Sequence, residues 1–285
     1  MRIAYQIGVH GKERQFKWLF DAIYNPHDLF VIHIDRKTPE AAARAMRETA
    51  GNRPNVYFSP QHSVIYSEWA MCEMELDAIR YLCENHKDWQ YFINLTGHDY
   101  PLKARDQIVT ELSKNPRQNF VQIIPLDTLP PYFRRRINWY CFRFGDRLIR
   151  TPLPHFVPRN IRVEWHGSGS HIITREFCEW LSKADAAQDC VRFLRHVKVP
   201  NEFLMQTLIM NSPFVGILST SYKRYIRWGN HVPHPVTMTM AHHDELIACD
   251  DLFARKFDEN VDSAILYALA RHIGAEPVPP RNGTS

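Results

Sequence analysis

Two adjacent cations near the C-terminal end of the sequence stand between aromatic residues. Arg255 and Lys256 are flanked by Phe253 and Phe257 in the run LFARKFD at 252–258. A buried cation is costly unless a partner compensates its charge. An arginine and a lysine in this frame therefore indicate a site for an anion, with phosphate as a candidate. The alternative is a strand flanked by two long side chains whose charged ends reach water.

The first half of the sequence alternates short apolar runs with amphipathic segments. The runs predict strands at 3–9, 29–35, 56–59 and 91–96, and the segments predict helices at 12–24, 39–49 and 67–85. Short buried strands separated by helices are typical of a parallel, doubly wound sheet. In such sheets ligands bind beyond the carboxyl ends of the strands. His10, Asp35 and Asp99 follow three of these strands and are therefore candidate ligand-binding side chains.

Residues 125–162 interrupt this alternation with a basic, proline-rich segment. Its arginines and aromatic residues are interleaved: Arg134, Arg135, Arg136, Arg143, Arg147 and Arg150 with Trp139, Tyr140, Phe142 and Phe144. This composition predicts an insertion over one face of the fold. Guanidinium groups bind phosphate and aromatic rings settle at membrane interfaces, so the segment suits an anionic acceptor or a phospholipid surface. A solvated loop with stacked arginine–aromatic pairs explains the pattern equally well.

The overall composition limits the class of protein. With 285 residues, of which 45% are hydrophobic, the chain is long enough for one large α/β domain. A formal net charge of +4 does not favour nucleic acid as the partner. No apolar run approaches the ~18 residues of a membrane span, and the N-terminal residues lack a signal-peptide pattern. The six cysteines show no zinc-ligand spacing, so we expect a cytosolic protein without disulfides or structural metal.

Six segments occur in an order that resembles one known family. They are IHIDRK at 32–37, SVIYSEW at 63–69, NLTGHDYPLK at 94–103, WHGSGS at 165–170, PNEF at 200–203 and FARKFD at 253–258. From about residue 3 to 258 the chain is thereby similar to the core-2/I-branching β-1,6-N-acetylglucosaminyltransferases and peptide O-xylosyltransferases, as a bacterial cytosolic relative. The resemblance implies an α/β, Rossmann-like GT-A-type fold and transfer of a sugar from a UDP donor with inversion.

The resemblance, combined with the position of the basic segment, implies one catalytic domain with an insertion. We expect a nucleotide-binding half at 1–124, the basic insertion at 125–162, and an acceptor and catalytic half at 163–275. The amphipathic pattern at 261–273 predicts a closing helix for this domain. Residues 276–285 are expected to form a flexible tail.

For the donor diphosphate, the resemblance implies basic side chains in place of a divalent cation. The sequence contains no Asp-x-Asp, the motif by which most enzymes of this fold hold a metal ion. Lys256 matches the family's diphosphate-binding lysine, and its charge would stabilise the departing UDP in the transition state. The family's second residue, an arginine in the N-acetylglucosaminyltransferases, has no match in the stretch 231–237. Arg227 or Arg255 could take its place.

Glu202 matches the family's catalytic glutamate, the general base beside the acceptor hydroxyl. Asn201 replaces the aspartate of the family motif, and the loss of that neighbouring negative charge is expected to lower the pKa of Glu202. The residues alone allow a different interpretation. Asn201 could cap a helix over 202–210, and Glu202 would then be a first-turn glutamate favoured by the helix dipole.

The remaining candidate residues are also implied by their match to the family. The predicted uridine contacts are Val9, His10 and Asp35. The predicted sugar or acceptor contacts are Asp99, Trp165 and Ser168. Three of them have structural alternatives, since His10 could cap the next helix, Asp99 could hold its own turn, and Trp165 could be core. Gly169 stands where the xylosyltransferases have an aspartate, which points away from peptide xylosylation.

The sequence thus predicts a metal-independent, inverting glycosyltransferase that uses UDP-GlcNAc, with UDP-xylose as the second choice. We expect the acceptor to be a cell-surface polysaccharide, free or lipid-linked, docked near residues 134–150. The protein would then be cytoplasmic, with peripheral contact at the anionic inner face of the cell membrane. Two alternatives come from other classes: a non-catalytic protein that binds nucleotide sugars or glycans, and a membrane- or RNA-binding module built on the arginine-rich segment.

Overall fold

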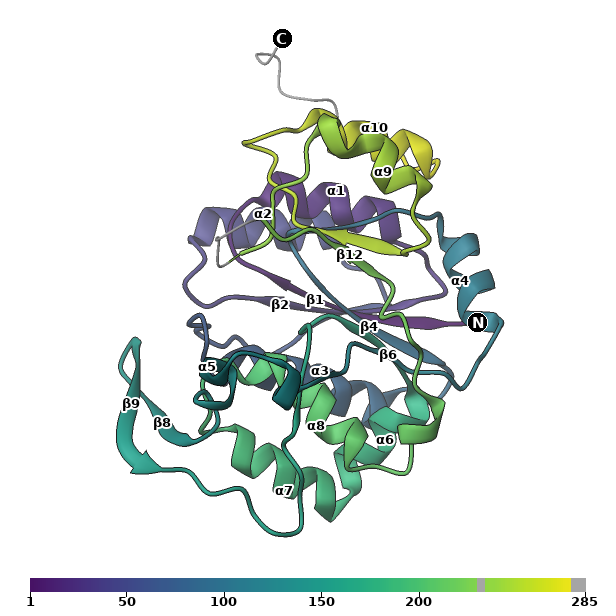
Figure 1. Ribbon diagram of the computed structural model, residues 1–285. Helices are drawn as coiled ribbons and strands as arrows, with labels where there is room; N and C mark the ends of the chain where they lie inside the picture. The colour runs from purple at the N-terminus through teal and green to yellow at the C-terminus, as the bar shows by residue number, and fades with distance from the viewer. Residues whose placement is uncertain (230–233, 278–285) are drawn as a thin grey trace.

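The computed structural model describes residues 1–229 and 234–277, and its centre is a mixed β-sheet (Figure 1). Six strands follow the order β3-β2-β1-β4-β11-β6. Their bounds are β1 Ile3–Val9, β2 Leu29–Ile34, β3 Val56–Phe58, β4 Tyr91–Thr96, β6 Phe120–Val121 and β11 His171–Thr174. The first four strands of that order are parallel, whereas β11 lies antiparallel between β4 and β6.

The four strands predicted in the first half are parallel, as expected, whereas the antiparallel β11 was not predicted. Parallel neighbours need a crossover, usually through a helix, whereas antiparallel neighbours can be joined by loops and turns. Between β6 and β11 the chain runs through the 125–162 segment and enters β11 from the opposite end. The ladder pairs Ile172 with Ile93 of β4 and with Phe120 of β6.

The strands at the centre are apolar throughout because both faces of the sheet are covered. All seven residues of β1 and all six of β2 are buried. Successive side chains of a strand point to opposite faces. Accordingly, Ala4 belongs to one hydrophobic core and its neighbours Ile3 and Tyr5 belong to another.

Helices cover the two faces unevenly. One core is closed by α1 (Glu13–Ile23), α2 (Glu40–Ala50) and α4 (Arg105–Ser113). The other is closed by α3 (Ala70–Asn85), α6 (Arg175–Lys183), α7 (Asp185–Leu194) and α8 (Leu204–Met210), which lie on the opposite side of the sheet (Figure 1). None of the helices in the described parts of the chain has both the length and the hydropathy that a membrane crossing requires.

A second, three-stranded sheet carries the C-terminal cations. It contains β5 (Asp99–Pro101), β12 (Arg224–Ile226) and β13 (Phe253–Arg255), in the order β12-β13-β5. Two helices, α9 (His243–Ala248) and α10 (Ala264–His272), share a third core with Trp18 of α1. The run at 252–258 is thus a buried strand followed by a turn, placed against β5 immediately after β4 ends.

The basic segment is more ordered than the sequence predicts. It contains β7 (Ile124–Pro125), the 3-10 turn η1 (Leu126–Thr128), α5 (Pro131–Arg134), and a hairpin of β8 (Trp139–Phe144) and β9 (Arg147–Pro154). Gly145 closes the hairpin with a φ of +58°, a conformation that favours glycine. After it, β10 (Trp165–His166) pairs with β7. Three further 3-10 turns are η2 (Pro200–Glu202), η3 (Val215–Ile217) and η4 (Met240–His242).

Most predicted elements agree with the structure within a few residues, and two helix starts are wrong. The helix expected from 67 begins at Ala70, and Ser67 has a φ of +73°. The helix expected over 202–210 begins at Leu204, because Phe203 leaves the helical region and Glu202 stays in η2. Of the expected tail, residues 278–285 lie outside the described residues, as do 231–233 of the stretch searched for a second arginine.

Candidate functional site

The carboxyl ends of β1, β2 and β4 meet at one edge of the large sheet. The backbone N–H of Asp35 donates to Val9 O at 2.9 Å, and that of Gly97 donates to Gly8 O at 3.0 Å. The three predicted uridine residues lie at this edge. Val9 is buried, so its side chain is core, whereas His10 is exposed and open to a ligand.

Asp35 fixes the loop that covers this edge. Its Oδ1 accepts from the N–H of Lys37 at 2.8 Å, and its Oδ2 accepts from the N–H of Val64 at 3.1 Å. His10 does not cap α1: the N-cap residue is Lys12, and the His10 ring lies 5.7 Å from the ring of His98. The capping alternative for His10 is therefore wrong, and its contact with uridine stays a prediction.

Gln15 connects this edge to the turn that carries Lys256. Its Nε2 donates to Gly97 O at 2.7 Å and to Phe257 O at 3.0 Å, and its Oε1 accepts from the N–H of Glu259 at 2.9 Å. The side chain is 2% exposed. The sequence analysis missed Gln15, although a polar residue on the apolar face of a predicted helix was a usable signal. A Lys12–Asp258 ion pair of 2.5 Å supports the same connection.

Arg255 and Lys256 are the cations of this turn, and neither has an anionic partner within residues 1–229 and 234–277. Phe253 and Phe257 are fully buried, which confirms the aromatic frame. Both cations are partly buried, and the charged group of neither has a hydrogen bond or ion pair with any residue that the structure describes. The Nε atom of Arg255 is buried without an acceptor. A buried donor without an acceptor is costly, so this pair suits an anionic ligand.

Arg227 is a weaker candidate for the diphosphate than Arg255. It pairs with Glu245 at 2.8 Å, and both side chains are about half exposed. Its charge is already compensated at the surface. Of the two arginines proposed from the sequence, the structure favours Arg255 for the second diphosphate contact, which stays a prediction.

Asp99 is held by its surroundings. Its Oδ2 accepts from the N–H and the hydroxyl of Thr96 at 2.6 and 2.7 Å, and its Oδ1 lies 3.3 Å from Nη1 of Arg224. The side chains of Asp99 and Arg224 are each 1% exposed. The geometry supports the alternative in which Asp99 holds its own turn. A contact between Asp99 and a sugar stays a prediction, without support from this arrangement.

Glu202 is the centre of a second charged group. Nη1 of Arg136 lies 2.5 Å and Nε2 of His166 lies 2.8 Å from the same oxygen, Oε2. The other oxygen, Oε1, has no partner among the described residues and is not sealed from solvent. Burial raises the pKa of Glu202, but the hydrogen bond to His166 and the charge of Arg136 outweigh it and lower the pKa. The carboxylate is therefore ionised, fixed at one oxygen and available at the other.

The backbone around Glu202 is set by a close approach to the WHGSGS segment. The N–H of Gly167 donates to Glu202 O at 3.0 Å. A Cβ on Gly167 would lie 2.1 Å from Gln122 O, so a larger residue cannot be accommodated there. The expected cap is wrong, because Asn201 has a buried Oδ1 without a partner and makes no capping bond. A Cβ on Gly169 would lie 2.8 Å from Asn201 Nδ2, so an aspartate at 169 would displace Asn201.

Trp165 and Ser168 have structural roles in the same segment. Trp165 is 9% exposed, and the guanidinium of Arg162 lies over its ring at 4.9 Å. The core alternative for Trp165 is thus favoured. The Ser168 hydroxyl accepts from the N–H of Ser170 at 3.1 Å, and Ser168 O accepts from Gln206 at 2.9 Å. Sugar contacts by these two residues stay predictions.

Arg136 and His166 were missed as functional residues by the sequence analysis. Arg136 was included there among the surface arginines, although it faces inward onto Glu202 and packs over the Phe133 ring at 4.7 Å. His166 stood inside a family motif without a role of its own. No local pattern in the sequence distinguishes Arg136 from Arg134 and Arg135, which are exposed.

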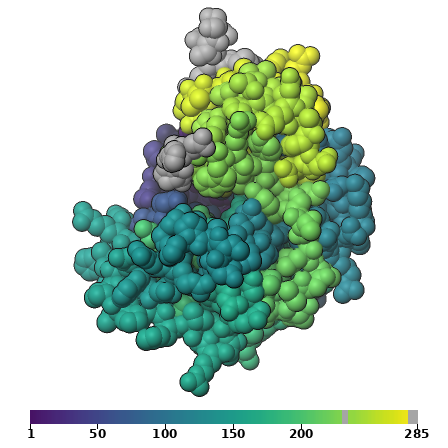
Figure 2. All heavy atoms as spheres, viewed as in Figure 1, coloured from purple at the N-terminus to yellow at the C-terminus, as the bar shows by residue number. Residues whose placement is uncertain are grey.

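The space-filling view shows a hollow between two parts of the chain. The surface is recessed between the teal part of the chain, which includes the 125–162 segment, and the yellow-green C-terminal part, with purple N-terminal atoms at the floor (Figure 2).

Among the described residues, no three His, Cys, Asp or Glu side chains are grouped as they would be to hold a metal ion. Metal independence stays a prediction.

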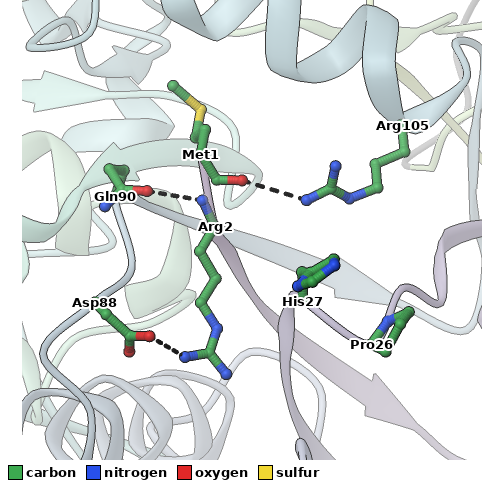
Figure 3. A pocket seen from close by; sticks show the side chains of 7 residues that line it. All are labelled: Met1, Arg2, Pro26, His27, Asp88, Gln90 and Arg105. Atoms are coloured by element: carbon green, nitrogen blue, oxygen red, sulfur yellow. Dashed lines mark hydrogen bonds and ion pairs between the residues drawn. The ribbon is translucent and has the colours of Figure 1, made fainter.

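A different hollow lies at the amino end of β1 (Figure 3). Arg2 pairs with Asp88, Gln90 accepts from the Arg2 N–H at 2.7 Å, and Arg105 donates to Met1 O at 3.3 Å. This is the sheet edge opposite to the carboxyl ends of β1, β2 and β4. It contains none of the predicted site residues and is separate from the candidate site.

A Rossmann-like sheet with its polar edge facing a cation pair, together with a fixed carboxylate, defines a glycosyltransferase of the GT-A type. The chain matches the sequence model of the Core-2/I-Branching enzyme family over residues 3–247, and it belongs to that family. The predicted family and fold class are thereby confirmed.

The chain is similar over nearly its whole length to mammalian enzymes of this family. It is 26% identical over 300 residues to beta-1,3-galactosyl-O-glycosyl-glycoprotein beta-1,6-N-acetylglucosaminyltransferase 3 of Rattus norvegicus, covering 95% of this chain and 68% of the relative. A Bos taurus enzyme of the same activity name is 26% identical over 298 residues, with 95% and 69% covered. Among solved structures, the galactosyltransferase LgtC aligns with a TM-score of 0.43 and 10% identity over 98% of each chain.

Proposed function

We propose that this protein transfers N-acetylglucosamine from a UDP donor to a hydroxyl of a glycan, with inversion and without a divalent metal. The observation that carries the proposal is the asymmetry of Glu202, whose Oε2 is held by Arg136 and His166 while its Oε1 is open. The mammalian relatives are named as β-1,6-N-acetylglucosaminyltransferases, which supports the choice of sugar. Xylose is the second choice.

On the acceptor side, Glu202 is the general base. An acceptor hydroxyl donates to Oε1, and the carboxylate takes its proton as the oxygen attacks the anomeric carbon. The bond between that carbon and the UDP oxygen breaks, and the configuration inverts. Arg136 and His166 hold Oε2 in place, and the hydrogen bond from His166 together with the charge of Arg136 keeps Glu202 ionised at neutral pH.

On the donor side, Lys256 and Arg255 bind the diphosphate and stabilise the charge that develops on UDP. Fixed cations aimed at a leaving group act most strongly in the transition state. The support is the absence of a protein partner for either cation in the described part of the chain, together with the buried Nε of Arg255. His10 and the loop fixed by Asp35 enclose the nucleotide at the sheet edge.

The acceptor and location belong to this proposal as well. A bacterial cell-surface polysaccharide, lipid-linked and assembled at the cytoplasmic face of the membrane, suits the exposed arginines of the 125–162 segment. Gly169, packed against Asn201, supports a glycan acceptor over peptide xylosylation. A non-catalytic sugar-binding protein is less well supported, since binding alone does not require a carboxylate held at one oxygen.

A panel of UDP-sugars tests the proposal through thermal unfolding in EDTA. A ligand that binds only the folded state at 100 times its Kd adds about 2.7 kcal/mol to the free energy of unfolding. UDP-GlcNAc is expected to protect most, UDP-xylose less and GDP-mannose not at all. Protection that requires added manganese, or none with any UDP-sugar, would overturn the proposal. UDP release from UDP-GlcNAc in EDTA, absent in Glu202→Gln, separates the enzyme from the non-catalytic alternative.

A further inference from the structure

The β8–β9 hairpin presents an apolar face to solvent. Opposed residues of an antiparallel pair share a face, and here Phe142 opposes Ile149 and Phe144 opposes Arg147. The exposed fractions are 39% for Phe142, 75% for Phe144 and 37% for Ile149. Leu153 of β9 and Phe156, two residues beyond its end, add to the exposed apolar surface at 61% and 81% exposed. We call these five apolar residues with Arg147 the hairpin face.

The opposite face of the hairpin is attached to the body of the protein. Cys141 is buried, and its N–H donates to His196 O at 2.8 Å. Arg143 donates to Ser63 O at 2.6 Å and pairs with Glu68 at 3.3 Å. The orientation of the hairpin is therefore fixed from its inner side, and the hairpin face is directed away from the core. Figure 1 shows the hairpin at the margin of the molecule, clear of the large sheet.

Uncompensated positive charge surrounds the hairpin face. From 131 to 160 the sequence contains seven arginines, one aspartate, and neither lysine nor glutamate. Arg136 and Arg143 are used in ion pairs with Glu202 and Glu68. The guanidinium groups of the other five lack a hydrogen-bond or ion-pair partner among the residues described: Arg134, Arg135, Arg147, Arg150 and Arg159. Exposed aromatic side chains thus share the hairpin face with the unpaired guanidinium group of Arg147, while Arg150 extends from the other face of the hairpin and the remaining three arginines lie elsewhere in the same segment.

We propose that the hairpin face docks this protein onto an anionic membrane surface. Aromatic and aliphatic side chains enter the boundary between headgroups and acyl chains, while guanidinium groups bind lipid phosphates. The combination favours a lipid surface over RNA, because aliphatic Ile149 and Leu153 have no stacking role with bases. It also favours a lipid surface over a second copy of this chain, because like-charged faces repel.

This inference rests on the proposed function for its purpose and not for its chemistry. The inner side of the same segment contributes Arg136 to Glu202. A membrane-docked hairpin would therefore hold the general base close to the lipid surface, where a lipid-linked glycan presents its hydroxyls. Docking is then expected to accelerate transfer to a lipid-linked acceptor and to leave transfer to a free glycan unchanged.

Sedimentation with vesicles tests the docking surface directly. The full chain is mixed with vesicles of phosphatidylglycerol and phosphatidylcholine, and with phosphatidylcholine alone. Strong binding to the anionic vesicles is expected, weakened by salt, with roughly a tenfold or greater loss in Phe144→Ser/Phe156→Ser and in Arg147→Gln/Arg150→Gln. Matched controls at other exposed sites, Val261→Ser and Arg117→Gln, are expected to bind as the wild type does.

Several outcomes would overturn the inference. They are equal binding to neutral vesicles, binding that survives both hairpin double variants, and single-stranded RNA that displaces the protein from vesicles at equal phosphate concentration. The sites changed are exposed, and unchanged UDP-dependent protection against unfolding verifies that each variant folds. Loss of vesicle binding with retained UDP protection supports docking. If UDP does not protect the wild type against unfolding, the proposed function is refuted, and the inference of membrane docking is unaffected.

Discussion

The group around Glu202 and the pair Arg255–Lys256 are two charged centres that the protein satisfies to different degrees. Glu202 has two partners on one oxygen, at 2.5 and 2.8 Å. The cation pair has no carboxylate partner among the described residues, although the aromatic residues on either side of it are fully buried. Within the part of the chain that the structure describes, the Glu202 group lacks a partner only at Oε1. The positive charge of the Arg255–Lys256 pair is not compensated by any described residue.

The two charged centres prepare for a reaction in different ways. In the proposed function, the acceptor side is organised in advance, because Glu202 as the base has one available oxygen and is ionised. The donor side leaves charge uncompensated, which costs stability in the free protein and returns it when an anion binds. Changes at Glu202 should therefore affect turnover, whereas changes at Lys256 should affect both turnover and nucleotide binding.

The largest expected effect is that of Glu202→Gln. The amide keeps the shape and can still contact Arg136 or His166, but it cannot take a proton. Transfer is expected to fall by about 10²–10⁴-fold in kcat. The Kd for UDP, measured by calorimetry, should stay within the error of the wild-type value. A variant that loses UDP affinity as well as turnover would contradict the separation of the two centres.

The next effect is that of Lys256→Ala. Loss of one fixed charge at the leaving group is expected to lower kcat by about 10²–10³-fold, and the Kd for UDP should rise with it. Arg227→Ala is the matched control, because Arg227 is half exposed and paired with Glu245. An exposed pair of this kind contributes about 0–1 kcal/mol to the free energy of unfolding and should leave transfer nearly unchanged. Equal losses in both variants would refute the assignment of the diphosphate site.

The smallest effect is a shift in pH dependence from Arg136→Gln. In the wild type the pKa of Glu202 is lowered, so the base stays ionised until the pH falls through that lowered value. Without the guanidinium the pKa rises, and activity is lost at a higher pH as the solution is acidified. The acidic limb of kcat/KM on a soluble acceptor should move upward in pH.

Arg135→Gln is the matched control for this shift, since Arg135 is exposed and adjacent to Arg136. Its pH profile should coincide with that of the wild type. A downward shift in Arg136→Gln, or an equal shift in both variants, would show that Arg136 does not set the protonation of Glu202.

The fold was predictable where a strand or helix is specified by its own residues. β1 and β4 were predicted with the bounds that the structure has, because their apolar runs are continuous. The direction of β11 was not, because a strand's own sequence does not encode the end from which the chain enters it. The hairpin of the basic segment was missed because its arginines and prolines were interpreted as loop composition.

Prediction of the site shows the same division. The cation pair and Glu202 were found through motifs, whereas Arg136 and Gln15 depend on contacts between residues 66 and 242 positions apart. Asp99 illustrates the opposite case. Its place after β4 indicated a ligand, but Thr96 and Arg224 occupy both of its oxygens.

The origin of Arg136 has a consequence for how such enzymes diversify. This arginine belongs to the same stretch as the outer hairpin, yet it contacts Glu202, the proposed base. Replacing this stretch to suit a new acceptor would also change the pKa of the glutamate that deprotonates the acceptor. Acceptor preference and the pH range of activity would therefore change together in this architecture. A hairpin grafted without its arginine would give a transferase whose base is ionised over a different pH range.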